Sequence, residues 1–174
     1  MAKGPTHIFV LVEDIVQQNL VRHYLNRAGL ATSCRFEPLP NGAGCGEQYV
    51  RKRFPEIVKK VQSSLGRAVA AIAVIMIDAD LETVAARRAQ LINSQQNTQD
   101  SVILIPKRHV ETWVGALLGN AVDELVDYKR QFGNATMVKQ AALELFNCAR
   151  PNAQLPPAIP QSLVTSIPEL QKIR

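Results

Sequence analysis

The chain has 174 residues, of which 47% are hydrophobic and 20% charged, and its net charge is +5. This length suits one domain with a full hydrophobic core, and this composition excludes wholesale disorder. No signal-peptide pattern opens the sequence, and the longest apolar run, residues 68–77, is about half as long as a membrane-spanning helix, so we expect a cytoplasmic protein without membrane contact. The mild positive charge permits nucleic acid as a partner without requiring it.

Strand and helix patterns alternate from the start of the chain. The β-branched and aromatic run HIFVLVE predicts a strand that ends at Glu13, and apolar residues at helical spacing then predict a helix up to Gly29. A weaker strand candidate, SCRFEPL, precedes the loop NGAGCG and a helix with one basic face. These segments favour β-α-β order.

The run AVAAIAVIMID contains no polar residue before Asp78, which is typical of a parallel strand covered by helices on both faces. Apolar positions from Leu81 to Ile92 predict a helix, and SVILIP predicts another buried strand ending at Pro106. We therefore expect an α/β fold of three layers, in which a parallel sheet of about four strands is flanked by helices, the arrangement of doubly wound, Rossmann-like domains.

Helical spacing resumes after Pro106, first through Leu117 and later over residues 138–146. Residues 151–174 are rich in proline and predict an arm that packs over the domain and contains one short helix. We accordingly divide the chain into an α/β domain over residues 1–150 and a C-terminal arm.

Acidic side chains follow two of the predicted strands. Asp78 and Asp80 come directly after the buried strand, and Glu13 ends the first one. Ligands of open parallel sheets bind beyond the carboxyl ends of the strands, and two carboxylates so close together repel unless a cation or hydrogen bonds compensate. A magnesium-type ion does so. Alternatively, Asp80 could simply cap the next helix, and the carboxylate of Glu13 could simply be stabilised by the N-terminal dipole of the first helix.

Cationic residues follow the strand SVILIP. Lys107 and Arg108 suit a phosphate there, and Glu111 on the next helix suits a metal ion, although ordinary surface charge is an equal interpretation. His109 is as compatible with a surface position as with proton transfer.

The loop NGAGCG contains Gly42, Gly44 and Gly46, which could present backbone N–H groups to a phosphate. It lacks the Walker and Rossmann spacings, and a plain loop is the simpler interpretation. The basic face of the following helix, including Arg51 and Lys52, could follow a nucleic-acid backbone, although such a face is often only solvated.

The order of these motifs resembles the Toprim domain: a strand ending in glutamate, a glycine segment, a strand ending in DxD, and a strand followed by lysine and VETW. The resemblance covers about residues 7–119 and implies that the conserved glutamate is Glu13 and the DxD pair is Asp78 and Asp80. The VETW string is similar to one in nucleases of the overcoming-lysogenisation-defect family, which implies a role for Glu111. The family's glycine after the glutamate is Asp14 here, an extra carboxylate.

This resemblance implies Mg²⁺- or Mn²⁺-dependent phosphodiester cleavage. The likeness is strongest to small stand-alone bacterial Toprim-like proteins, some of which are associated with phage-defence or mobile-element systems. Glu13 would be general base or metal ligand, and Lys107 would stabilise phosphate charge. Two alternatives remain open: a non-catalytic partner or regulatory subunit of a larger complex, which a neighbouring gene could complete, and a receiver-like domain phosphorylated on Asp78. Oligomeric state and substrate stay undetermined.

Overall fold

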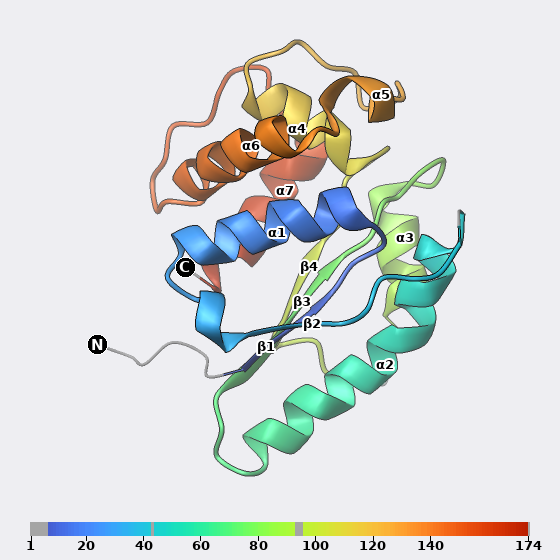
Figure 1. Cartoon of the computed structure of the whole chain (residues 1–174), viewed down its shortest axis with the longest axis vertical. Coiled ribbons are helices and arrows are strands. Elements are labelled where there is room, and N and C mark those ends of the chain that lie inside the picture. Colours follow the sequence, from blue (N-terminus) through green and yellow to red (C-terminus); the bar gives the residue numbers. More distant parts are fainter. Residues whose placement is uncertain (1–6, 43, 93–95, 174) are drawn as a thin grey trace.

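A computed structural model describes residues 7–42, 44–92 and 96–173 and confirms the α/β fold (Figure 1). Four parallel strands form one sheet in the order β2-β1-β3-β4. Their bounds are β1 His7–Leu11, β2 Cys34–Phe36, β3 Ala71–Met76 and β4 Ser101–Leu104. The strands predicted from sequence are therefore confirmed, and β1 and β3 are neighbours as the proposed acidic site requires.

Helices cover both faces of the sheet, so the molecule has three layers (Figure 1). One face is covered by α2 (Gly46–Leu65) and α3 (Val84–Leu91). The other face carries α1 (Ile15–Arg27), α4 (Val110–Leu117), α6 (Ala135–Cys148) and α7 (Gln161–Gln171). A short helix, α5 (Lys129–Phe132), follows the long connection after α4 and was not predicted.

The apolar strands supply both halves of the core. In β1, Ile8 and Val10 face the side of α1, whereas Phe9 and Leu11 face the side of α2. All four side chains are buried, because successive residues of a strand point to opposite faces and each face is covered. This explains why the strands are apolar without alternation.

The register of β1 and β3 places their carboxyl ends at one edge of the sheet. Val10 pairs with Val74, and Leu11 pairs with Ile75. Glu13 and Asp78 follow two and three residues after the last pair. Parallel pairing thus brings side chains 65 positions apart in sequence to neighbouring places.

The helix after β3 begins later than predicted. The sequence pattern suggested a start at Leu81, but α3 starts at Val84, and its cap is Thr83, whose hydroxyl accepts a hydrogen bond from the Ala86 N–H (3.0 Å). The interpretation of Asp80 as a simple helix cap is therefore wrong.

The C-terminal helix belongs to the core of the domain. Leu163, Ile167 and Leu170 of α7 are buried in the same cluster as α1, α4 and α6. Trp113 of α4 donates its indole N–H to the Ser162 hydroxyl at 2.8 Å, and this bond is buried. Among the described residues, none of the helices combines the length and apolar character needed to cross a membrane.

Candidate functional site

Glu13 lies directly against the residue that begins the DxD segment. The Asp78 backbone N–H donates to the Glu13 carboxylate (N···Oε1 2.8 Å). The side chain of Asp78 is only 2% exposed, so it forms the floor of the site rather than its mouth. The structure thus brings together the two carboxylates that the sequence placed at adjacent strand ends.

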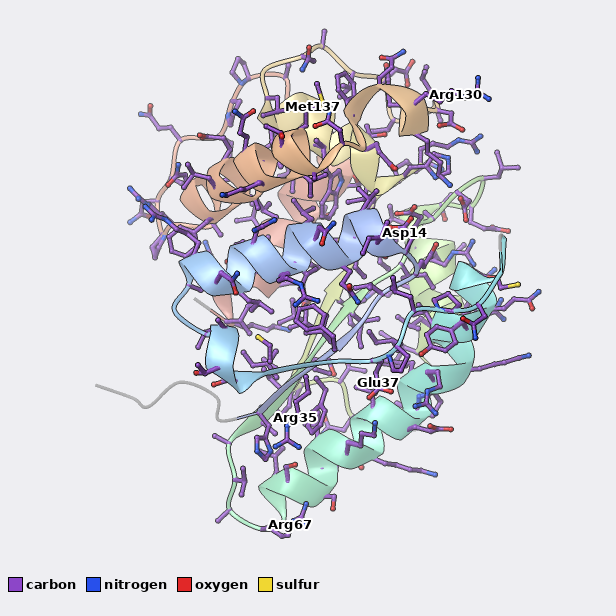
Figure 2. The ribbon with its side chains drawn as sticks, in the orientation of Figure 1. Asp14, Arg35, Glu37, Arg67, Arg130 and Met137 are labelled. Carbon is purple, nitrogen blue, oxygen red and sulfur yellow. The ribbon has the colours of Figure 1, made fainter. Side chains whose placement is uncertain are left out.

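Gln17 ties these two residues to α1. Its amide Nε2 donates to Oδ1 of Asp78 at 2.9 Å, and its Oε1 accepts from the Glu13 backbone N–H at 3.0 Å. Asp14 caps the same helix by accepting from the Gln17 backbone N–H at 2.9 Å, and it marks the start of α1 in Figure 2. Gln17 itself is fully buried.

Asp80 stands at a strained turn beside this floor. Its φ is 53°, in the left-handed region that residues other than glycine seldom occupy, although aspartate tolerates it better than most. Its side chain is 39% exposed, and Oδ2 lies 3.7 Å from Arg87 Nη2. Non-glycine residues held in this region cluster at functional sites, where the surrounding structure offsets the cost.

His109, the residue before α4, closes the site from another side. Its ring is buried, and Nδ1 lies 3.5 Å from Oδ2 of Asp78 and 3.5 Å from Oδ1 of Asp80. Its Nε2 lies 3.6 Å from Oδ2 of Asp127, in the segment before α5. The sequence left the role of this histidine open, and the structure places it between carboxylates on both sides.

Glu111 extends the acidic cluster in the first turn of α4. It is 3% exposed, and its Oε2 is buried without a hydrogen-bond partner in the described part of the chain. Burial raises its pKa, and the charge of Asp14 adds to that effect. Glu111 therefore belongs to the same electrostatic neighbourhood as the residues around Asp78.

Burial and mutual repulsion shift the titration of the whole cluster. Burial, together with the charge of Asp78, raises the pKa of Glu13 to about 9. Burial also raises the pKa of Asp78 well above its ordinary value, and the charges of Asp14 and Glu111 act in the same direction. Burial, then the charge of Lys129, lowers the pKa of His109, which favours its neutral form. The site thus contains more carboxylate than its own protein charges balance.

A pocket of about 400 Å³ opens in front of Glu13 and Asp80. Gly42, Gly44 and Gly46 line it, and Lys129 contributes a cation. Gly46 needs its missing side chain, because a Cβ there would lie 2.8 Å from Glu13 Cβ. The first residue of α2 therefore packs on the backbone of Glu13.

The other cations predicted for the site do not line the glycine pocket. Lys107 donates to the Glu82 carbonyl and lines a separate pocket next to α3 and α7. Arg51 pairs with Glu47 at 2.7 Å. Lys52 is an exposed residue of α2 outside the lining of the glycine pocket, and Arg108 is half-buried near Asp127. Lys129, which lines the glycine pocket, and Arg87, beside Asp80, are cations near the acids, whereas Lys107 lines a different pocket.

The oxygen and nitrogen atoms of this site are chemically suited to bind a hard divalent ion. Carboxylate oxygens predominate, burial and mutual repulsion raise the pKa values of Glu13 and Asp78, and buried atoms of His109 and Glu111 lack hydrogen-bond partners among the described residues. In the part of the chain that is described, no group of three or more His, Cys, Asp or Glu side chains has the arrangement of a formed metal site. An ion would therefore have to draw these side chains closer together.

The sequence reasoning missed Gln17, Asp127 and Lys129. The sequence does contain a signal for Gln17. This residue lies on the apolar face of α1 with Leu20 and Tyr24, and a polar residue on a buried helical face needs a hydrogen-bond partner. The sequence contains no such signal for Asp127 and Lys129. They lie after an irregular connection, and its course cannot be predicted from the spacing of apolar residues.

No protein-family model matches this chain, and neither a curated protein nor a solved structure gives a significant match. The Toprim resemblance therefore stays a prediction, and function must be argued from the site itself.

Proposed function

We propose that this chain is a divalent-metal-dependent, nuclease-like domain that cleaves phosphodiesters. The observation that carries the proposal is the meeting of Glu13, Asp78 and Asp80 at the edge of a parallel sheet, with raised carboxyl pKa values and a pocket in front. Mg²⁺ or Mn²⁺ would be held by these carboxylates, and Glu111 is a further oxygen donor nearby. The chemistry such an ion supplies is activation of water and neutralisation of phosphoryl charge.

The protein's own groups have distinct parts in this reaction. Asp78 is anchored by Gln17 and Glu13 by the backbone of Asp78, so the carboxylates are positioned before a substrate arrives. Glu13 is protonated near neutral pH while it lacks a neighbouring cation, so it accepts a proton or binds an ion only once positive charge enters. Lys129 and the N-terminal end of α2 face the pocket and suit a phosphate.

The overall reaction is hydrolysis. A water oxygen bonds to phosphorus, one phosphorus–oxygen ester bond breaks, and the products are a phosphomonoester and an alcohol. One proton of the water goes to the leaving oxygen and the other to the general base. Lys107 is left without a part in this scheme, because its side chain is held at the Glu82 carbonyl.

A plasmid assay tests the proposal. Supercoiled DNA is incubated with Mg²⁺ or Mn²⁺ and with wild-type protein, Glu13→Gln, Asp78→Asn or the control Glu144→Gln, which alters an exposed carboxylate of α6. Wild type and the control should nick the plasmid, and the two site variants should not. Equal nicking by all four proteins would rule the site out.

A second candidate function, partner binding without catalysis, is favoured by apolar side chains around the same site. Leu81, next to Asp80, is 86% exposed, and Leu125, close to Asp127, is 73% exposed. Ile15, beside Asp14, is 52% exposed. Such a rim suits a protein surface as well as a nucleobase. Absence of divalent-ion binding by calorimetry, together with absence of cleavage, would favour this function over the first.

A further inference from the structure

Helix capping does not account for the buried position of the His109 ring. The residue is 5% exposed, and it precedes α4 without any side-chain hydrogen bond to cap it. Its Nδ1 is buried and has no hydrogen-bond partner among the described residues. A buried polar atom without a partner costs free energy, so its direction toward Asp78 and Asp80 calls for an explanation.

The distances around Nδ1 are slightly longer than those between ligands that share an ion. Oδ2 of Asp78 and Oδ1 of Asp80 are each 3.5 Å from it. Two ligands that are each about 2.1 Å from one ion are about 3.0 Å apart at a right angle and about 3.4 Å apart at a tetrahedral angle. Small side-chain movements would thus bring all three atoms onto a common centre.

The other ring nitrogen faces a carboxylate that can fix the orientation of the ring. Nε2 lies 3.6 Å from Oδ2 of Asp127, whose Oδ1 accepts from the Lys129 backbone N–H at 2.9 Å. Histidines that bind metals usually donate their second N–H to a carboxylate, a carbonyl or water, which sets tautomer and direction. Asp127 is therefore a positioning residue for His109.

We propose that His109 is a nitrogen ligand of the divalent ion, together with Asp78 and Asp80, and that Asp127 orients it. This inference rests on the proposed metal site and adds to it a prediction about ion identity. Imidazole binds Mn²⁺, Co²⁺ and Zn²⁺ readily, whereas Mg²⁺ prefers oxygen ligands and keeps its waters. The site should therefore prefer transition-metal ions over Mg²⁺.

Pulsed electron paramagnetic resonance of bound Mn²⁺ tests the proposal without measuring activity. We expect a coupled nitrogen in the wild-type spectrum, and we expect its frequency to change when the protein is grown with ¹⁵N-labelled histidine. The nitrogen coupling should disappear in His109→Gln and persist in His23→Asn, which alters the half-exposed histidine of α1. Asp127→Asn should keep the coupling and lower Mn²⁺ affinity by about 10-fold or more.

The outcomes separate this inference from the proposed function. Bound Mn²⁺ without histidine nitrogen coupling, with binding lost in Asp78→Asn, would overturn the role of His109 and leave the carboxylate site intact. A coupling that survives in His109→Gln would overturn it too. Absence of Mn²⁺ binding to the wild-type protein would overturn both. The wild-type spectrum by itself shows whether a histidine nitrogen binds the ion, so the proposal can be tested even if His109→Gln fails to fold.

Discussion

The carboxylate of Glu13 accepts a hydrogen bond from the backbone N–H of Asp78, and this 2.8 Å contact joins the ends of β1 and β3. Because the donor belongs to the main chain, the contact fixes Glu13 whatever the charge on the Asp78 side chain. Two acids that repel one another are thus held together by the fold itself. An incoming cation would relieve this repulsion and favour the ionised form of both acids.

Replacing Gln17 by leucine should destabilise the protein. The change removes the bridge between the Glu13 N–H and Asp78 Oδ1 and leaves both groups without their partner in a buried place. We expect the free energy of unfolding to fall by about 1–3 kcal/mol. Urea unfolding measures this, and Gln18→Leu, next to it on a more exposed face of α1, is the matched control, with an expected change within about 0.5 kcal/mol. Equal losses in both variants would contradict the role of Gln17.

The stability of the metal-free protein should fall as the pH rises above neutrality. The pKa of Glu13 is about 9 in the folded protein and near 4.5 when unfolded, so at pH 7 and above the unfolded chain has lost a proton that the folded chain retains. Each such carboxyl lowers the free energy of unfolding by up to about 1.4 kcal/mol per pH unit until the folded pKa is reached. Asp78 acts in the same direction.

Urea unfolding in the presence of a chelator, between about pH 7 and pH 8.5, measures this slope above the range in which histidines titrate. Glu13→Gln keeps an acceptor for the Asp78 N–H but no longer titrates, so its slope should be smaller. Glu144→Gln should keep the wild-type slope. A wild-type protein whose stability rises with pH in this window would contradict the predicted shift.

The sequence predicted the parallel sheet and the meeting of Glu13 with Asp78 because both follow from apolar strands and short-range periodicity. The uninterrupted apolar run before Asp78 required helices on both faces, and α2 and α1 provide them. The positions of His109 and Lys129 could not be predicted in this way. Lys129, and Asp127 which faces His109, lie in the irregular connection between α4 and α6, where no periodic pattern sets the course of the chain.

Lys107 illustrates the same limit. The sequence correctly placed it after β4, but side-chain direction depends on partners that come from other segments, here the Glu82 carbonyl. The need for a glycine in the NGAGCG segment was easier to predict, because Gly46 lies so close to Glu13 that a side chain cannot fit there.

Gly46→Ala should damage the site and the fold together. The new methyl group would meet Glu13 Cβ at 2.8 Å and the Glu13 carbonyl oxygen at 3.1 Å, so either α2 or the end of β1 must shift. We expect a loss of about 1–3 kcal/mol in the free energy of unfolding and weaker divalent-ion binding by calorimetry. Gly66→Ala, at the other end of α2, is the control, since its Cβ would meet nothing closer than 3.4 Å. Ion binding by Gly46→Ala at wild-type affinity would contradict the close packing of α2 on Glu13.

Asp80 and Thr83 should differ in their contributions to stability. Thr83 caps α3 through its hydroxyl, so Thr83→Ala should lower the free energy of unfolding by about 1 kcal/mol. Asp80 holds a positive φ that glycine adopts without strain, so Asp80→Gly in the metal-free protein should leave stability unchanged within about 0.5 kcal/mol or raise it. Calorimetric titration with Mn²⁺ should show the reverse order, with binding weakened in Asp80→Gly and retained in Thr83→Ala. If Asp80→Gly instead costs as much stability as Thr83→Ala and binds Mn²⁺ normally, the carboxylate of Asp80 serves the fold rather than an ion.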